Sequence, residues 1–215
     1  DVCQPAILAM SVAAWRVAAE HGLRGDVVLG HSLGEYSALV AAGAIDYGQA
    51  LRIVAERGAA MHAAGQERPG TMAALLGQGD TEAEDLCERA GDVWPANYNS
   101  PGQVVASGSM DGIERLLAIA AEEGVKSIRL QVGGAFHSPL MAPASERLAP
   151  ALEAWDPTEP QPAFLSTTTV DIEPAERLRE VLLAQLTSPV RFAHAVQKAL
   201  DMGVTQFVEL GPGRV

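Results

Sequence analysis

Cysteine is scarce in this sequence of 215 residues, which contains only Cys3 and Cys87. The two lie far apart in the chain, and no group of histidines accompanies either of them. The sequence therefore offers neither a disulfide framework nor the ligand spacing of a zinc site. We expect two ordinary thiols, no metal and no other cofactor.

Long apolar runs and an excess of positive charge are also missing. No run approaches the ~20 apolar residues that span a bilayer, and residues 1–5 lack the basic-then-apolar layout of a signal peptide. The formal net charge is −12, and only two of the 15 basic residues are lysines. We therefore expect a cytoplasmic protein that binds neither nucleic acid nor membrane and holds an anionic substrate through local arginines. We also expect a monomer.

Hydrophobic residues make up 48% of the chain, which is enough for one domain with a full core and a small insertion. Helices and strands alternate in the apolar pattern, which favours an α/β fold. We expect a hydrolase-like three-layer α/β core with a parallel sheet, formed by residues 1–68 and 133–215. The helices are predicted over 4–20, 33–42, 47–64, 139–154, 173–185 and 192–202, and the strands over 27–29, 163–166 and 206–210.

Residues 69–132 follow a different pattern. Strands are predicted over 71–76, 93–97, 103–107 and 126–132, and helices over 81–90 and 111–123. The resulting β-α-β-β-α-β order is that of a ferredoxin-like subdomain, which we expect to be inserted in the larger core. Within it, a turn is predicted over 98–102, and Thr81 and Glu84 have the spacing of a capping box.

A Gly-x-Ser-x-Gly motif centred on Ser32 joins an apolar strand directly to a predicted helix. The motif alone is common by chance, but this context is the one that a nucleophile elbow requires. The elbow presents a serine hydroxyl at the end of a strand, above the N-terminus of the next helix. We therefore interpret Ser32 as a nucleophile; the alternative is a serine with a structural role in a turn.

A serine nucleophile needs a general base, and the chain contains five histidines. His21, His62 and His194 fall in or at the ends of predicted helices, and we expect His31 to point away from its neighbour Ser32. His137 differs, because it lies in a glycine-rich loop immediately before a predicted helix. Such a loop can present the imidazole at the carboxyl edge of the sheet, so His137 is the candidate base.

Several segments of the chain resemble malonyl-CoA:acyl carrier protein transacylases of the discrete fatty-acid type, which are related to polyketide synthase acyltransferase domains. The resemblance covers essentially the whole sequence. The segments occur in the family's order: GHSLGEYSA (30–38), ERG followed by Met61 (56–61), NYNSPGQVVASG (97–108), GAFHSPLM (134–141), SPVRF (188–192) and ELGPG (209–213).

The resemblance implies a role for each matching residue. Ser32 would be the nucleophile and His137 its general base. The main-chain carbonyl of Gln185 would orient the imidazole in place of the usual third carboxylate, and the backbone N–H of Leu33 would donate to the oxyanion.

The resemblance also implies that Arg57 binds the free carboxylate of the malonyl group and that Asn99 supports substrate binding. A planar guanidinium forms two parallel hydrogen bonds to a carboxylate and so favours diacid thioesters over acetyl thioesters. Without the family, the more ordinary interpretation of Arg57 is a solvated helix arginine paired with Glu56. The Gly-Ala-Phe-His sequence at 134–137 resembles the malonyl-type version of the histidine motif.

The expected function is transfer of a malonyl group from malonyl-CoA to the phosphopantetheine thiol of acyl carrier protein, through a malonyl-serine ester, for fatty-acid biosynthesis. The alternatives are an acyltransferase domain fragment of a polyketide synthase, a serine hydrolase of acyl thioesters and a non-catalytic carrier-protein docking module. Family members begin with a strand and a Gly-Gln-Gly loop upstream of Gln4 and continue beyond residue 215. We therefore expect a chain truncated at both ends, in which the second oxyanion donor is missing.

Overall fold

The computed structural model describes residues 2–212 and divides the chain into two compact units. The first unit comprises the residues up to Ala59, Leu148–Leu183 and the residues from His194 onward. The second comprises Ala60–Arg147 and Ala184–Ala193. Residue 213 of the ELGPG segment lies outside the described residues. Between residues 2 and 212, no helix combines the length and the apolar character that a membrane crossing needs.

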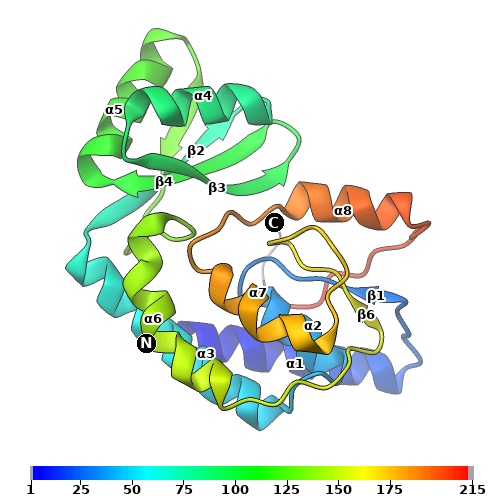
Figure 1. Cartoon of the computed structure of the whole chain (residues 1–215). Helices are drawn as coiled ribbons and strands as arrows, with labels where there is room; N and C mark the ends of the chain where they lie inside the picture. The colour runs from blue at the N-terminus through cyan, green and yellow to red at the C-terminus, as the bar shows by residue number, and fades with distance from the viewer. Residues whose placement is uncertain (1, 213–215) are drawn as a thin grey trace. The chain divides into compact units, whose positions relative to one another are not determined.

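The first unit places helices around a short parallel strand pair (Figure 1). Val27 pairs with Ala163 and Val28 with Phe164. Apolar residues of α8 pack with these strands and the residues that follow them, in a cluster that includes Leu165, Ala195 and Ala199. The elements are α1 (Cys3–Glu20), β1 (Val27–Val28), α2 (Gly34–Ala41), the first part of α3 (Tyr47–Glu67), β6 (Ala163–Phe164), a 3₁₀ turn (Ala175–Arg177), α7 (Leu178–Ala184) and most of α8 (Phe192–Asp201).

The second unit contains a four-stranded antiparallel sheet with the strand order β3-β4-β2-β5. This is the ferredoxin-like arrangement that the element order predicted. The elements are β2 (Gly70–Leu76), α4 (Asp80–Ala90), β3 (Val93–Ser100), β4 (Gln103–Ser109), α5 (Met110–Glu122) and β5 (Lys126–Arg129), followed by a 3₁₀ turn (Pro139–Met141) and α6 (Ala142–Glu153), whose last residues belong to the first unit.

Strand β2 shows why this sheet has two apolar faces. Ala73 and Leu75 point to one face, where they pack with apolar residues of α4 and α5. Figure 1 shows these two helices on one side of the sheet. Met72 and Ala74 point to the other face, where they pack with Phe136 and its neighbours. Since side chains alternate along a strand, the continuous apolar run of β2 fills both cores.

The prediction of a strand over 206–210 is wrong, because these residues form no strand in the structure. A strand needs a hydrogen-bonded neighbour, and within residues 2–212 no strand pairs with this segment. Its side chains are correspondingly exposed, with Phe207 at 49% and Val208 at 59%.

Three smaller details of residues 69–132 also differ from the prediction. The turn is shorter than 98–102, since β3 continues to Ser100 and β4 begins at Gln103. The last strand ends at Arg129 instead of residue 132, and Ile128 is 48% exposed. Among the described residues, β5 has one neighbouring strand, β2. The capping box does not form, since helix α4 is capped by Gly79 without a side-chain hydrogen bond.

Candidate active site

The segment between β1 and α2 has the geometry of a nucleophile elbow. Ser32 has a φ of 52°, in the left-handed region that residues other than glycine seldom adopt. The Gly34 amide donates to the His31 carbonyl at 2.9 Å, and the Glu35 amide donates to the Ser32 carbonyl at 3.0 Å. These bonds begin α2 immediately after the serine, so the chain turns sharply at the position that the motif predicted.

The two glycines of the motif have different roles. A Cβ atom at Gly30 would lie 2.0 Å from the Gly34 carbonyl carbon and 2.2 Å from its oxygen, which no side chain can tolerate. A Cβ atom at Gly34 would meet no heavy atom of residues 2–212 within 4 Å, apart from its chain neighbours and its own helix. The close approach of position 30 to the start of α2 therefore requires only the first glycine.

A buried carboxylate connects the elbow to the residues that follow β6. Glu35 Oε1 accepts hydrogen bonds from Ser166 Oγ at 3.0 Å, the Thr167 amide at 2.6 Å and Thr167 Oγ1 at 2.9 Å. Thr167 Oγ1 also lies 3.1 Å from the Gly30 carbonyl oxygen, so its proton is shared between two acceptors. Sequence reasoning missed these residues; a glutamate among apolar residues just after the motif was the available signal.

Arg57 lies beside the serine. Its side chain is 1% exposed, and its Nη2 donates to Ser32 Oγ at 3.0 Å. Its Nη1 donates to Gln4 Oε1 at 2.7 Å. The interpretation of Arg57 as a solvated arginine paired with Glu56 is therefore wrong, because Arg57 is buried and Glu56 is exposed on the same helix.

Burial dominates the electrostatics around this arginine. Loss of solvent lowers the pKa of Arg57, and the nearby Tyr36 and Glu35 partly oppose that change. The guanidinium carbon lies 5.7 Å from the centre of the Tyr36 ring. Burial also raises the pKa of Tyr36 to about 12, although Arg57 acts in the opposite direction. Tyr36 is therefore a neutral phenol at physiological pH, and the positive charge of Arg57 faces the seryl oxygen.

His137 belongs to the second unit and is 5% exposed. Its Nδ1 lies 2.9 Å from the Gln185 carbonyl oxygen. A carbonyl can only accept, so the neutral imidazole carries its proton on Nδ1 and keeps a basic lone pair on Nε2. This bond has the geometry that the resemblance implied for Gln185.

The loop that carries His137 is fixed by close packing and by a local cap. A Cβ atom at Gly65 would lie 2.6 Å from the Gly133 carbonyl oxygen, so the loop runs directly over helix α3. His137 has a φ of 57°, and the next residue begins the 3₁₀ turn: Ser138 Oγ donates to the Ala135 carbonyl at 2.7 Å and accepts from the Leu140 amide at 3.3 Å. The backbone therefore holds the imidazole in a defined orientation.

The remaining predicted site residues lie one in each unit. Leu33 is the N-cap residue of α2, which places its amide at the start of that helix. Asn99 belongs to strand β3 instead of the predicted turn, at a point where the pairing register with β4 shifts by one residue. Such bulges re-aim side chains and are frequent beside active sites. In all, the structure joins Ser32 to Arg57 in one unit and His137 to Gln185 in the other.

Within residues 2–212, Cys3 and Cys87 take part in no disulfide. Cys3 is exposed and Cys87 is buried, and burial raises the pKa of Cys87 to about 12 with a smaller contribution from Glu84. Across residues 2–212, no group of three or more His, Cys, Asp or Glu side chains has the arrangement of a metal site.

The model of the acyl transferase domain family matches residues 1–213. The chain belongs to this family. It is 43% identical to a malonyl CoA-acyl carrier protein transacylase of Bacillus subtilis and 39% identical to one of Escherichia coli K12, over 99% of this chain and 69% and 71% of those proteins. The crystal structure of MCAT from Streptococcus pneumoniae is 40% identical, with a TM-score of 0.94 over 99% of this chain and 71% of that one.

The chain is also similar to an acyltransferase domain from a polyketide synthase. The acyltransferase domain of an iterative polyketide synthase in enediyne biosynthesis is 39% identical, with a TM-score of 0.85 over 90% of this chain and 51% of that one. The predicted family and the α/β fold class are thus confirmed.

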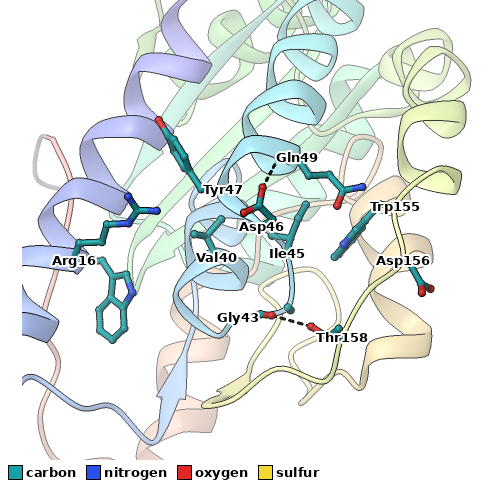
Figure 2. Close-up of a pocket in the computed structure, with 12 residues that line it drawn as sticks. Arg16, Val40, Gly43, Ile45, Asp46, Tyr47, Gln49, Trp155, Asp156 and Thr158 are labelled. Atoms are coloured by element: carbon teal, nitrogen blue, oxygen red, sulfur yellow. Dashed lines mark hydrogen bonds between the residues drawn. The ribbon is translucent and has the colours of Figure 1, made fainter.

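A surface pocket of about 510 Å³ lies elsewhere on the first unit of this acyl transferase chain (Figure 2). Arg16 lies over the Tyr47 ring at 5.3 Å, and Thr158 Oγ1 donates to the Gly43 carbonyl at 2.8 Å. The residues that line the pocket include none of the predicted site residues. We therefore do not assign the acyl transfer chemistry to this pocket.

Proposed function

We propose that this chain transfers a malonyl group from malonyl-CoA to the phosphopantetheine thiol of an acyl carrier protein in fatty-acid biosynthesis. The observation that carries the proposal is the hydrogen bond from the buried Arg57 guanidinium to Ser32 Oγ. It combines a serine in an elbow with a fixed positive charge at the oxygen that would become acylated. An enzyme that handled acetyl groups alone would have no use for that charge.

The separation of these two groups suits a malonyl ester. One methylene separates the ester carbonyl from the free carboxylate, whose oxygens would lie roughly 3–5 Å from the seryl oxygen. Arg57 Nη2 is 3.0 Å from that oxygen, so the guanidinium is within reach of the carboxylate. Arg57 would then form charge-assisted hydrogen bonds that an acetyl ester cannot make.

The reaction would proceed in two half-reactions. His137 Nε2 removes the proton of Ser32 as Oγ attacks the thioester carbonyl, and the Leu33 N–H stabilises the oxyanion. The carbon–sulfur bond breaks, and His137 returns the proton to the sulfur of coenzyme A. The carrier thiol then attacks the malonyl ester, giving its proton to His137, which passes it to Ser32 Oγ as the ester bond breaks. Gln185 keeps the imidazole in the required tautomer, and Asn99 assists substrate binding.

The names of similar proteins support both malonyl-CoA and an acyl carrier protein as substrates of this chain. Those compared above are named malonyl CoA-acyl carrier protein transacylases. A further structure, 42% identical with a TM-score of 0.94 over 99% of this chain and 71% of that one, is described as a type II PKS acyl-carrier protein in complex with its malonyl-transacylase. By extension, we propose that a carrier protein is the acceptor here and that the enzyme is a cytoplasmic monomer. We also propose the domain organisation expected from the sequence, with a small subdomain formed by 69–132 and a core formed by 1–68 and 133–215.

The intact mass of the chain after exposure to malonyl-, methylmalonyl- and acetyl-CoA tests this proposal. We expect a malonyl adduct that is absent in the Ser32→Ala variant and that a phosphopantetheinylated carrier protein removes. Release of free malonate without a carrier would instead identify a thioester hydrolase. Carrier binding with no adduct would identify a docking module.

The second candidate is an acyltransferase domain of a polyketide synthase, favoured by the structural likeness to the enediyne domain. Competition between a fatty-acid carrier protein and a polyketide carrier protein for the malonylated enzyme distinguishes the two. Faster discharge by the fatty-acid carrier supports the proposed pathway, and faster discharge by the polyketide carrier contradicts it.

A further inference from the structure

We infer that Gln4 is a positioning residue that sets the preference of this enzyme for acyl groups with a free carboxylate. Gln4 acts by holding Arg57. The inference rests on the proposed function, in which Arg57 binds the malonyl carboxylate. Gln4 lies in the first turn of α1, far from Ser32 and Arg57 in the sequence.

The two terminal nitrogens of Arg57 are held by different partners. Nη2 donates to Ser32 Oγ at 3.0 Å, and Nη1 donates to Gln4 Oε1 at 2.7 Å. An arginine side chain has four rotatable bonds, so its orientation depends on the groups that contact the guanidinium, which here include the Tyr36 ring 5.7 Å from the guanidinium carbon. The bond from Nη1 to Gln4 adds a directional constraint on the plane of the guanidinium, and bidentate recognition of a carboxylate depends on the orientation of that plane.

Packing holds Gln4 itself in place. A Cβ atom at Gly58 would lie 3.6 Å from Gln4 Cδ, 3.7 Å from Cγ and 3.8 Å from Cβ. The glutamine therefore lies along the surface of α3 beside Arg57, in ordinary van der Waals contact with position 58. Because Gln4 and Arg57 come from different helices, the bond between them also ties α1 to α3.

The neutrality of the glutamine matters for the substrate. An amide oxygen accepts from the guanidinium without cancelling its charge, whereas a carboxylate at the same place would form an ion pair with Arg57. That ion pair would compete with the malonyl carboxylate for the same cation. Glutamine thus orients the arginine and leaves its charge for the substrate.

Two substitutions separate orientation from charge. Gln4→Met keeps the length of the side chain and removes the acceptor, and Gln4→Glu keeps an acceptor and adds a negative charge. Gln66→Met is the matched control, since Gln66 is an exposed glutamine of α3. For each protein, kcat and KM are measured with malonyl-CoA and with acetyl-CoA, using a phosphopantetheinylated carrier protein as the acceptor.

We expect Gln4→Met to raise the KM for malonyl-CoA about tenfold, in line with the loss of a hydrogen bond to a charged group. Gln4→Glu should raise it further, by about 100-fold, because the new carboxylate occupies the guanidinium. The kinetic constants for acetyl-CoA should change less than threefold in both, and those of Gln66→Met should match the wild type. A merely structural role would lower activity toward both thioesters alike.

The outcomes separate this inference from the function on which it rests. A wild-type protein that forms no malonyl adduct contradicts the proposed function. A wild-type protein that transfers malonyl groups, together with Gln4 variants whose malonyl-to-acetyl ratio is unchanged, overturns the role of Gln4. If Gln4→Met unfolds at a lower urea concentration, Gln4→Glu decides alone, since only the inferred role predicts a loss confined to malonyl-CoA.

Discussion

Gly30→Ala should lower the free energy of unfolding and Gly34→Ala should raise it, although both glycines belong to the same Gly-x-Ser-x-Gly motif. At position 30 the new methyl group would lie 2.0 Å from the backbone of Gly34. Side-chain carbons do not approach other heavy atoms closer than 3.0 Å, so the elbow would have to open by about 1 Å. The obstacle is backbone, which cannot rotate away as a flexible side chain could.

These geometries translate into free energies of opposite sign. Overpacking of this kind costs about 1–3 kcal/mol where side chains can adjust, and we expect Gly30→Ala to lose at least ~3 kcal/mol because they cannot. At position 34 the methyl group meets no obstacle, and alanine in the first turn of α2 restricts the unfolded chain more than glycine does. Gly34→Ala should therefore gain about 0.5–1 kcal/mol.

Urea unfolding followed by circular dichroism measures both changes against the wild type, and each variant serves as the control for the other. Since both residues lie in the first unit, the same transition reports on both. Acylation at Ser32, measured by intact mass, should be lost in Gly30→Ala at urea concentrations where the chain is still folded. The reasoning is refuted if Gly30→Ala unfolds at the wild-type midpoint, or if Gly34→Ala loses more than ~1 kcal/mol.

Three further predictions follow from individual groups. Gln185→Met should lower the transfer rate by less than about tenfold, because His137 bonds to the main-chain carbonyl, whereas His137→Ala should abolish transfer; equal losses in steady-state rates would contradict this. Burial raises the pKa of Tyr36 from 10.0 to about 12, so with rising pH the tyrosine hydroxyl ionises first in the unfolded chain. The free energy of unfolding should therefore fall by about 2–3 kcal/mol between pH 10 and 12. In the Tyr36→Phe variant, urea midpoints measured over the same pH range should lack this contribution. A thiol reagent should modify Cys3 alone in the folded chain and both cysteines in urea, since Cys87 is buried with a raised pKa; two fast equivalents in the folded chain would contradict its burial.

Sequence patterns predicted the secondary-structure elements and turns that depend on residues close together in the chain. The elbow at Ser32 could be found because strand, tight turn and helix are consecutive in the chain, and the ferredoxin-like order could be found because its six elements are short and periodic. The turn before β4 was placed too early, because turn-forming residues can also continue a paired strand, as Asn99 and Ser100 do in β3.

Contacts between distant segments could not be found this way. Glu35 and Thr167 are 132 positions apart, and Gln4 and Arg57 are 53 apart, so no spacing rule connects them. The burial of Arg57 likewise depends on what packs around α3, and from the sequence alone a helix arginine is more often solvated. The strand predicted over 206–210 failed for the related reason that alternation shows one face of a strand but not its hydrogen-bonded neighbour.

The bond from His137 to the Gln185 carbonyl bears on how long a malonylated enzyme would last. A carbonyl gives an imidazolium less stabilisation than a carboxylate would, so the proposed base is a mild one. A mild base suffices for a thiol, which is a far stronger acid than water: a cysteine thiol has a pKa of about 8.5, whereas water has a pKa of about 15.7. The acyl-enzyme would therefore persist between the two encounters, and its lifetime would be set by the arrival of the carrier protein.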